Sequence, residues 1–179
     1  GAKVDSFGVG ERLITSRAEP VFSGVYKLSA IESQGVMEPR MKLSDNPEKV
    51  TNPGEEEVFR LYDRETGQVE ADLITLMGEK LDDTKPLTIF DPLHTWKRKT
   101  LTHFRAEPLM KPLFKKGVSC AKKRDIEEIR SSCQKQLTTL WDSLKRFENP
   151  QEYYVDLSVD LWTLKESFLR QETCGWGKP

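Results

Sequence analysis

The stretch EEVFRLYD-RETG-QVEADLITLM, residues 56–77, decides the fold of this chain. Apolar and polar residues alternate in EEVFRLYD (56–63), as they do in a strand with one buried face. RETG (64–67) has the composition of a turn, and QVEADLITLM (68–77) returns as a second strand-like run. We therefore expect an antiparallel hairpin at this point, with other elements added around it.

Further strand-like segments lie on both sides of the hairpin. They are rich in β-branched and aromatic residues, and they cover residues 20–33, 39–44, 87–91 and 98–107. Gly24 interrupts the first of them and is a candidate bulge. Residues 45–54 contain two prolines, two asparagines and a glycine, so we expect an irregular loop there.

After residue 108 the apolar period changes to three or four residues, which indicates helices. Asp125 is a candidate N-cap for a helix that we expect to run to Phe147, before the helix-ending Asn149-Pro150. A second helix is expected over residues 157–170. The first helix should bury one apolar stripe in the core, with Cys133 as a small buried hydrophobe; the alternative is that the stripe docks a partner. The stripe contains Ile126, Ile129, Cys133, Leu137, Leu140, Trp141, Leu144 and Phe147.

These segments predict an α+β chain with three regions. Residues 1–18 read as a strand followed by a glycine turn, residues 19–107 as an antiparallel β-rich domain, and residues 108–179 as a helical C-terminal region.

Composition excludes several classes of function. The 179 residues include 28 basic and 29 acidic side chains in interspersed positions, which argues against a nucleic-acid groove. No apolar stretch approaches the roughly 18 residues of a membrane span. Two histidines and three cysteines without C-x-x-C spacing predict neither a disulfide framework nor a metal site, and they favour a reducing, cytoplasmic setting: Cys120, Cys133 and Cys174.

A glycine-rich turn, Gly8-Val9-Gly10, lies in KVDSFGVGERLITSR (3–17). Without Cβ atoms, the backbone N–H groups of such a turn can converge on one anion. The dinucleotide fingerprint needs a third glycine where this chain has Leu13, so that interpretation fails. A plain structural turn and an anion site both remain open, and Arg17 lies near enough in sequence to join such a site.

The basic residues and the histidines each allow two interpretations. Lys27, Arg40, Lys42 and Lys49 are either solvated side chains or a group of cations that faces a polyphosphate. The two histidines, His94 and His103, are either a base with a proton shuttle or residues with local hydrogen bonds.

Several ordered motifs resemble the C-terminal part of nicotinate phosphoribosyltransferases, and the resemblance spans about residues 3–160. The segments that carry it are VDSFGVGERLIT (4–15), PVFSGVYKL (20–28), RMKLSDNPEKVTNPG (40–54), FRLYD (59–63), FDPLHTW (90–96) and NPQEYYVDLS (149–158). Glu11 departs from the threonine that the family usually carries after the second glycine.

The resemblance implies a fold and a site. The chain would contribute a late strand and phosphate loop to the irregular α/β barrel of a type II phosphoribosyltransferase, followed by the β-rich domain and the C-terminal helices. The phosphate would be bound by Ser6, Gly8, Val9, Gly10 and Arg17. The pyrophosphate end of the substrate would be bound by Lys42 and Lys49.

The resemblance also implies an activity for a longer protein, typically a homodimer. That protein would form nicotinate mononucleotide from nicotinate and phosphoribosyl pyrophosphate, with ATP and magnesium, in NAD synthesis. The family's catalytic histidine lies upstream, so we expect no catalytic residue in this chain and no activity from it alone. The alternative is a non-catalytic β-rich binding or oligomerisation module.

Overall fold

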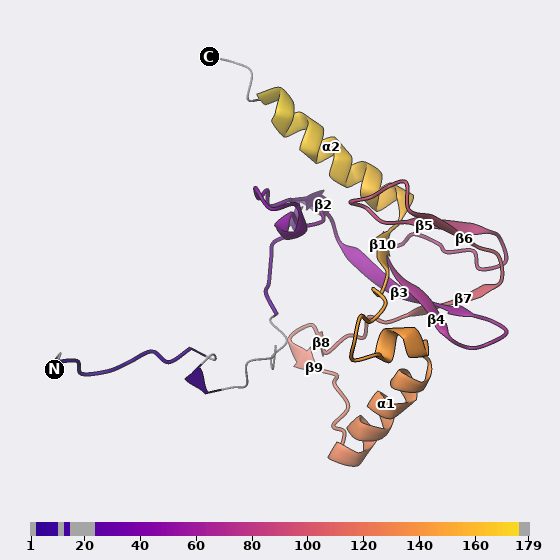
Figure 1. The fold of residues 1–179 in the computed structure, drawn as a ribbon. Coiled ribbons are helices and arrows are strands. Elements are labelled where there is room, and N and C mark those ends of the chain that lie inside the picture. Colours follow the sequence, from indigo (N-terminus) through magenta and orange to yellow (C-terminus); the bar gives the residue numbers. More distant parts are fainter. Residues whose placement is uncertain (1–2, 11–12, 15–23, 176–179) are drawn as a thin grey trace.

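The predicted hairpin is the centre of the molecule. The computed structural model describes residues 3–10, 13–14 and 24–175. In it, β3 (Glu56–Asp63) pairs antiparallel with β4 (Val69–Leu76), with Arg60 opposite Asp72. The edges of this sheet are β7 (Phe104–Pro108), antiparallel to β3, and β10 (Val155–Leu157), parallel to β4. The strand order is β10-β4-β3-β7 (Figure 1).

Small hairpins and two helices surround the sheet. The hairpins pair β1 (Ala30–Ser33) with β2 (Val36–Pro39), β5 (Leu87–Phe90) with β6 (Arg98–Leu101), and β8 (Phe114–Lys115) with β9 (Val118–Ser119). The helices are α1 (Ile126–Thr138) and α2 (Val159–Gly175), with single 3₁₀ turns at Pro47–Lys49 and Asp142–Lys145. In Figure 1, α1 lies at one end of the sheet and α2 projects from the other.

The core lies between one face of the sheet and the β5–β6 hairpin. Alternation along β3 and β4 places their apolar side chains on this face. The buried cluster contains Leu61, Ala71, Leu73, Ile89, Leu101 and Phe104. In the first turn of α2, Leu161 is fully buried, and the Trp162 ring meets Phe90 of β5 edge to face at 5.6 Å between centroids. The antiparallel β-rich interpretation of this region is therefore confirmed.

Several predicted strands have different bounds. Residues 24–29 form no strand, so Gly24 is not a bulge, and residues 20–23 lie outside the described residues. The strand expected at 39–44 occurs earlier, as β2, because Gln34 and Gly35 both have positive φ (53° and 79°) and make a two-residue turn. The segment expected as one strand at 98–107 is divided into β6 and β7 by a bend.

The first helix is shorter and more exposed than the sequence predicted. Asp125 does cap α1, because its side chain accepts a hydrogen bond from the Glu128 N–H. The helix ends at Thr138, where the chain turns to β4: the Val69 N–H donates to the Thr139 carbonyl at 2.8 Å. No residue of α1 is buried, so the prediction of a core stripe and of a buried Cys133 was wrong.

Residues 3–10 form no strand, which differs from the strand expected at the start of the chain. None of the helices in the described ranges is both long enough and apolar enough to cross a lipid bilayer.

One buried carboxyl lies at the border of the core. Asp156 on β10 is 4% exposed and pairs in register with Leu73. Burial, and secondarily the nearby Asp91 carboxylate, raise the pKa of Asp156 from 3.8 to about 6. Because the folded pKa lies above the unfolded value, the protonated form is favoured in the folded state. Stability should therefore fall as pH rises from about 4 to about 6.

We predict that Asp156→Asn stabilises the chain at about pH 8, by roughly 1–3 kcal/mol, because it removes a charge that is buried without compensation. Below about pH 4 the variant and the parent chain should unfold at similar denaturant concentrations. Urea unfolding at the two pH values checks this, with the exposed Glu152→Gln as control. A variant that is no more stable than the parent at about pH 8 would contradict this account of Asp156.

Candidate functional site

The loop at residues 40–54, called the lysine loop here, carries both predicted pyrophosphate residues, Lys42 and Lys49. Prolines and asparagines prevent regular pairing within it, as the composition indicated. Its only regular element is the 3₁₀ turn at Pro47–Lys49, where the Lys49 N–H donates to the Asn46 carbonyl at 2.9 Å. The loop therefore has a defined turn next to one of its two lysines.

Hydrogen bonds close the lysine loop at two levels. Across its middle, the Lys42 N–H donates to Thr51 Oγ1 at 2.8 Å, and the Thr51 N–H donates back to the Lys42 carbonyl at 3.2 Å. At its ends, the Ser29 carbonyl accepts from the N–H groups of Arg40 and Gly54, each at 2.7 Å. Both ends of the loop are thus held at one point beside β1.

The base of the lysine loop is buried against β4 and α2. Pro53 is fully buried, and Gly54 has a φ of +103°, which side chains other than glycine rarely adopt. A Cβ at Gly54 would lie 2.8 Å from Leu76 Cδ2 on β4 and 3.6 Å from Leu164 Cδ2 on α2. Glycine is therefore needed here for backbone conformation and for close approach.

Charged groups also fix the base. Lys165 on α2 donates to Asn52 Oδ1 at 2.9 Å. Glu56 at the start of β3 is half-buried and interacts with both residues. Burial raises the pKa of Glu56, and the hydrogen bond from Asn52 and the charge of Lys165 partly offset this. Burial likewise lowers the pKa of Lys165, against the attraction of Glu56. Each charge thus favours the ionised form of the other, against the effect of burial.

Lys42 and Lys49 themselves are exposed. Neither ammonium group forms an ion pair with the side chains that the structure describes. A loop with fixed ends and two unpaired cations can receive an anion without first ordering a free chain, which costs about 1–2 kcal/mol per residue. Both predicted lysines thus lie on one anchored loop.

The glycine segment is arranged differently. Residues 3–10 are exposed, and a bend occurs at Asp5, next to Ser6. A Cβ at Gly8 or Gly10 would meet nothing within 4 Å, so the described chain does not crowd the backbone here. In Figure 1 this segment is drawn apart from the sheets. Arg17, the remaining predicted phosphate residue, lies outside the described residues.

Both histidines have local contacts. His94 Nδ1 lies 2.9 Å from Asp91 Oδ2, and the other carboxylate oxygen of Asp91 accepts from the backbone N–H groups of Leu93 and His94. The His103 carbonyl accepts from the Arg64 N–H at 3.1 Å. The Asp91 contact fits the interpretation of His94 as a residue with a local hydrogen bond, whereas the contact of His103 involves only its backbone.

Sequence reasoning missed Asn52, Glu56 and Lys165 as parts of the candidate site. Asn52 and Lys165 are 113 positions apart, and no motif in either segment links them. Only the packing of α2 on the end of the hairpin brings them together.

The comparisons with known proteins agree with this architecture. A family model described as the nicotinate phosphoribosyltransferase C-terminal domain matches residues 55–165. The nicotinate phosphoribosyltransferase of Bacillus subtilis (strain 168) is 42% identical over 165 residues, which are 92% of this chain and 34% of that protein. The human enzyme is 32% identical over 168 residues, 93% of this chain and 30% of that protein.

A solved structure gives the same result for the fold. The crystal structure of human nicotinic acid phosphoribosyltransferase matches with a TM-score of 0.62 at 27% identity, over 73% of this chain and 25% of that chain. The fold and the matched residues together define a C-terminal domain of the phosphoribosyltransferase class. This chain belongs to the nicotinate phosphoribosyltransferase C-terminal domain family. It spans about a third of the length of the curated relatives reported above.

We predict that Gly54→Ala lowers the free energy of unfolding by about 2–4 kcal/mol, since it combines a strained φ with a contact against Leu76. Gly35→Ala is the matched control, because Gly35 also has a positive φ (+79°) but has open space around it. That control should lose only about 1 kcal/mol. If urea unfolding shows the same loss of unfolding free energy for both variants, the contact with Leu76 adds nothing to the cost of the strained φ.

Proposed function

We propose that this chain is the C-terminal part of a nicotinate phosphoribosyltransferase. The longer protein would join nicotinate to phosphoribosyl pyrophosphate, with ATP hydrolysis, to give nicotinate mononucleotide and pyrophosphate in NAD synthesis. The observation that carries the proposal is the 42% identity with the Bacillus subtilis enzyme across 92% of this chain. The structural observation that supports the proposal is the lysine loop, whose base is fixed.

In this proposal, Lys42 and Lys49 bind the pyrophosphate group of phosphoribosyl pyrophosphate. Ammonium groups suit this role because they are compact charges that can follow a flexible polyphosphate. Each charge-assisted hydrogen bond contributes roughly 1.5–3 kcal/mol. Because the loop is held by β4 and α2, little of that free energy is lost in ordering it.

The glycine segment would bind the phosphate of the product. The N–H groups around Gly8, Val9 and Gly10, with the Ser6 hydroxyl, are the donors, and Arg17 would add a cation. As glycines, Gly8 and Gly10 carry no Cβ that would stand between the backbone and an anion. Phe7 and Val9 are exposed in this chain, 79% and 55%, and the barrel of the longer protein would cover them.

ATP, magnesium and a second subunit belong to the proposal for the longer, cytoplasmic protein. Among the residues that the structure describes, no three His, Cys, Asp or Glu side chains lie together so that they could hold a metal ion.

The chain alone should form no nicotinate mononucleotide, because the proposed catalytic histidine lies in the part that it does not span. The assay supplies nicotinate, phosphoribosyl pyrophosphate, ATP and magnesium to the purified 179-residue chain. The longer protein is the positive control. Product above the no-protein background with the chain alone would contradict the division of roles proposed here.

In the longer protein, Lys42→Ala and Lys49→Ala should each raise the apparent KM for phosphoribosyl pyrophosphate by about tenfold, as expected for the loss of one charge-assisted contact. The apparent KM for nicotinate should change little. Lys80→Ala is the matched control, since Lys80 is exposed and lies outside the lysine loop. If both variants kept parental kinetics, the two lysines would be surface charges only.

Gly10→Val should lower kcat/KM of the longer protein by well over about tenfold, because a branched side chain would stand between the backbone and the phosphate. If Gly10 serves the anion and not the packing of a turn, the melting temperature should change little. Kinetics and melting are measured on the same preparation. A lower melting temperature with parental kcat/KM per folded molecule would assign Gly10 to a structural turn instead.

A further inference from the structure

A groove with a basic lining lies on the opposite side of β3 from the core. It is bounded by the end of the sheet, by the segment that contains the β8–β9 hairpin, and by α1. Its volume is about 730 Å³, within the range of small-molecule sites in proteins. Arg60 and Tyr62 form part of its floor, Lys111, Lys122 and Arg124 line one side, and Gln136 lines the other.

The sequence around the groove is unlike the rest of the chain in charge. Residues 105–124 contain a single acidic residue, Glu107, against seven basic ones: Arg105, Lys111, Lys115, Lys116, Lys122, Lys123 and Arg124. The whole chain has a net charge of only −1. The positive charge is therefore concentrated in the segment that forms one wall of the groove.

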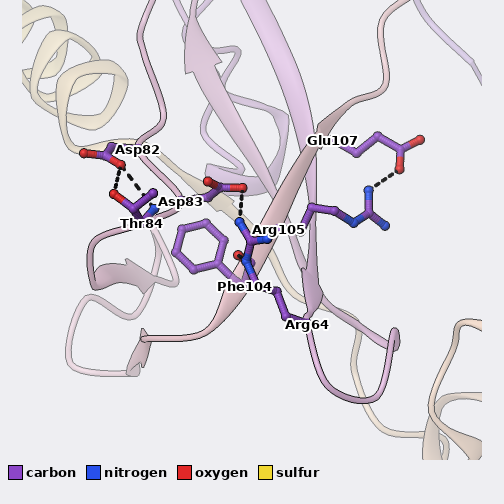
Figure 2. Close-up of polar contacts among 7 residues, drawn as sticks. All are labelled: Arg64, Asp82, Asp83, Thr84, Phe104, Arg105 and Glu107. Carbon is purple, nitrogen blue, oxygen red and sulfur yellow. Dashed lines mark hydrogen bonds and ion pairs between the residues drawn. The ribbon is translucent and has the colours of Figure 1, made fainter.

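The acidic groups nearest the groove are already paired. Glu107 accepts from Arg105 at 2.7 Å, as Figure 2 shows. Asp72 accepts two hydrogen bonds from Arg60, at 2.8 and 2.9 Å. Glu107, which lines the groove itself, and Asp72 therefore each have a cationic partner other than the three cations of the side wall.

The carboxylates in the first turn of α1 are engaged as well. Asp125 and Glu128 form the reciprocal capping box of the helix, and Glu127 pairs with Arg130 at 2.7 Å. Lys111, Lys122 and Arg124 have neither an ion pair nor a side-chain hydrogen bond within the ranges that the structure describes. Three exposed, unneutralised cations thus face one concave space.

The three cations of the side wall indicate which kind of ligand the groove can bind. A single exposed ion pair contributes about 0–1 kcal/mol, so one phosphate at one lysine would hardly be retained. Linked phosphates can meet several cations together, and each bond to a charged donor is stronger than a neutral one. Ser132 and Gln136 of α1 offer polar groups beside the cations. A groove of about 730 Å³ suits a small molecule.

We propose that this groove binds a small ligand that carries two or more linked phosphate groups. Lys111, Lys122 and Arg124 contact its phosphate oxygens, and Gln136 adds a hydrogen bond from α1. Neither the family match nor the relatives' names assign a role to the groove. The proposal does not rest on the activity proposed above.

The test uses isothermal titration of the 179-residue chain with sodium tripolyphosphate at low ionic strength, where surface charges are least screened. The parent chain should bind one tripolyphosphate in a saturable way. Lys122→Ala with Arg124→Ala should raise the Kd at least tenfold. Lys115→Ala with Lys116→Ala is the matched control. It removes the same charge from the β8–β9 turn, where Lys116 and Gly117 have positive φ (49° and 77°) and neither lysine lines the groove.

Additional arms separate the ligand classes. Orthophosphate should bind at least tenfold more weakly than tripolyphosphate, and ATP that binds more tightly than tripolyphosphate would indicate a nucleotide. The altered side chains are exposed, so melting temperatures should stay at the parental value. If the double alanine variant melts early, Lys122→Gln with Arg124→Gln replaces it. No saturable binding of tripolyphosphate, or an equal loss from both double variants, would overturn the proposal.

Discussion

The rest of the structure depends on one ion pair in the middle of the sheet. Arg60 on β3 and Asp72 on β4 lie directly opposite each other and form two hydrogen bonds, at 2.8 and 2.9 Å. Tyr153 donates to the same carboxylate at 2.9 Å. These side chains join the hairpin to the segment that leads into β10. The pair is partly buried, with 18% and 12% of the two side chains exposed, and removing one partner is destabilising because the other charge is left alone.

From this pair the arrangement continues to the candidate site. The Asp72 N–H donates to the Tyr154 carbonyl at 3.0 Å, which helps to hold the start of β10 beside β4. Ser158 follows β10 and accepts from the Leu161 N–H at 3.1 Å through its hydroxyl, so α2 begins at a fixed place. At that place α2 brings Leu164 and Lys165 to the base of the lysine loop.

Another ion pair joins distant turns of the chain. Arg64 lies 2.7 Å from Asp83 and so connects the hairpin turn to the segment before β5 (Figure 2).

The sequence predicted what depends on local pattern. The hairpin was predicted because Leu61, Ala71 and Leu73 lie on a period-two face, and the start of α1 because Asp125 is a typical N-cap residue. The capping box that Asp125 forms with Glu128 was found only in the structure. The end of α1 was not predicted, since it depends on the Thr139 carbonyl meeting Val69, seventy positions earlier. An apolar period also cannot show whether its partner lies in the same chain, so the α1 stripe was assigned to a core that it does not join.

The candidate site divides in the same way. Lys42 and Lys49 were identified from a motif, but their support by Asn52, Gly54 and Lys165 comes from tertiary packing. The basic groove was missed because balanced charge over the whole chain hid a local excess in residues 105–124. Counting charge by segment would have found it.

The central claim is that β4 and α2 hold the lysine loop in its shape without any ligand. Amide hydrogen exchange of the free chain tests it most directly, because Thr51 and Gly54 donate to the carbonyls of Lys42 and Ser29. The account predicts that these two amides exchange at rates close to those of the β3 and β4 amides. Exchange of Thr51 and Gly54 at the rate of an unstructured chain, while β3 and β4 remain protected, would contradict it.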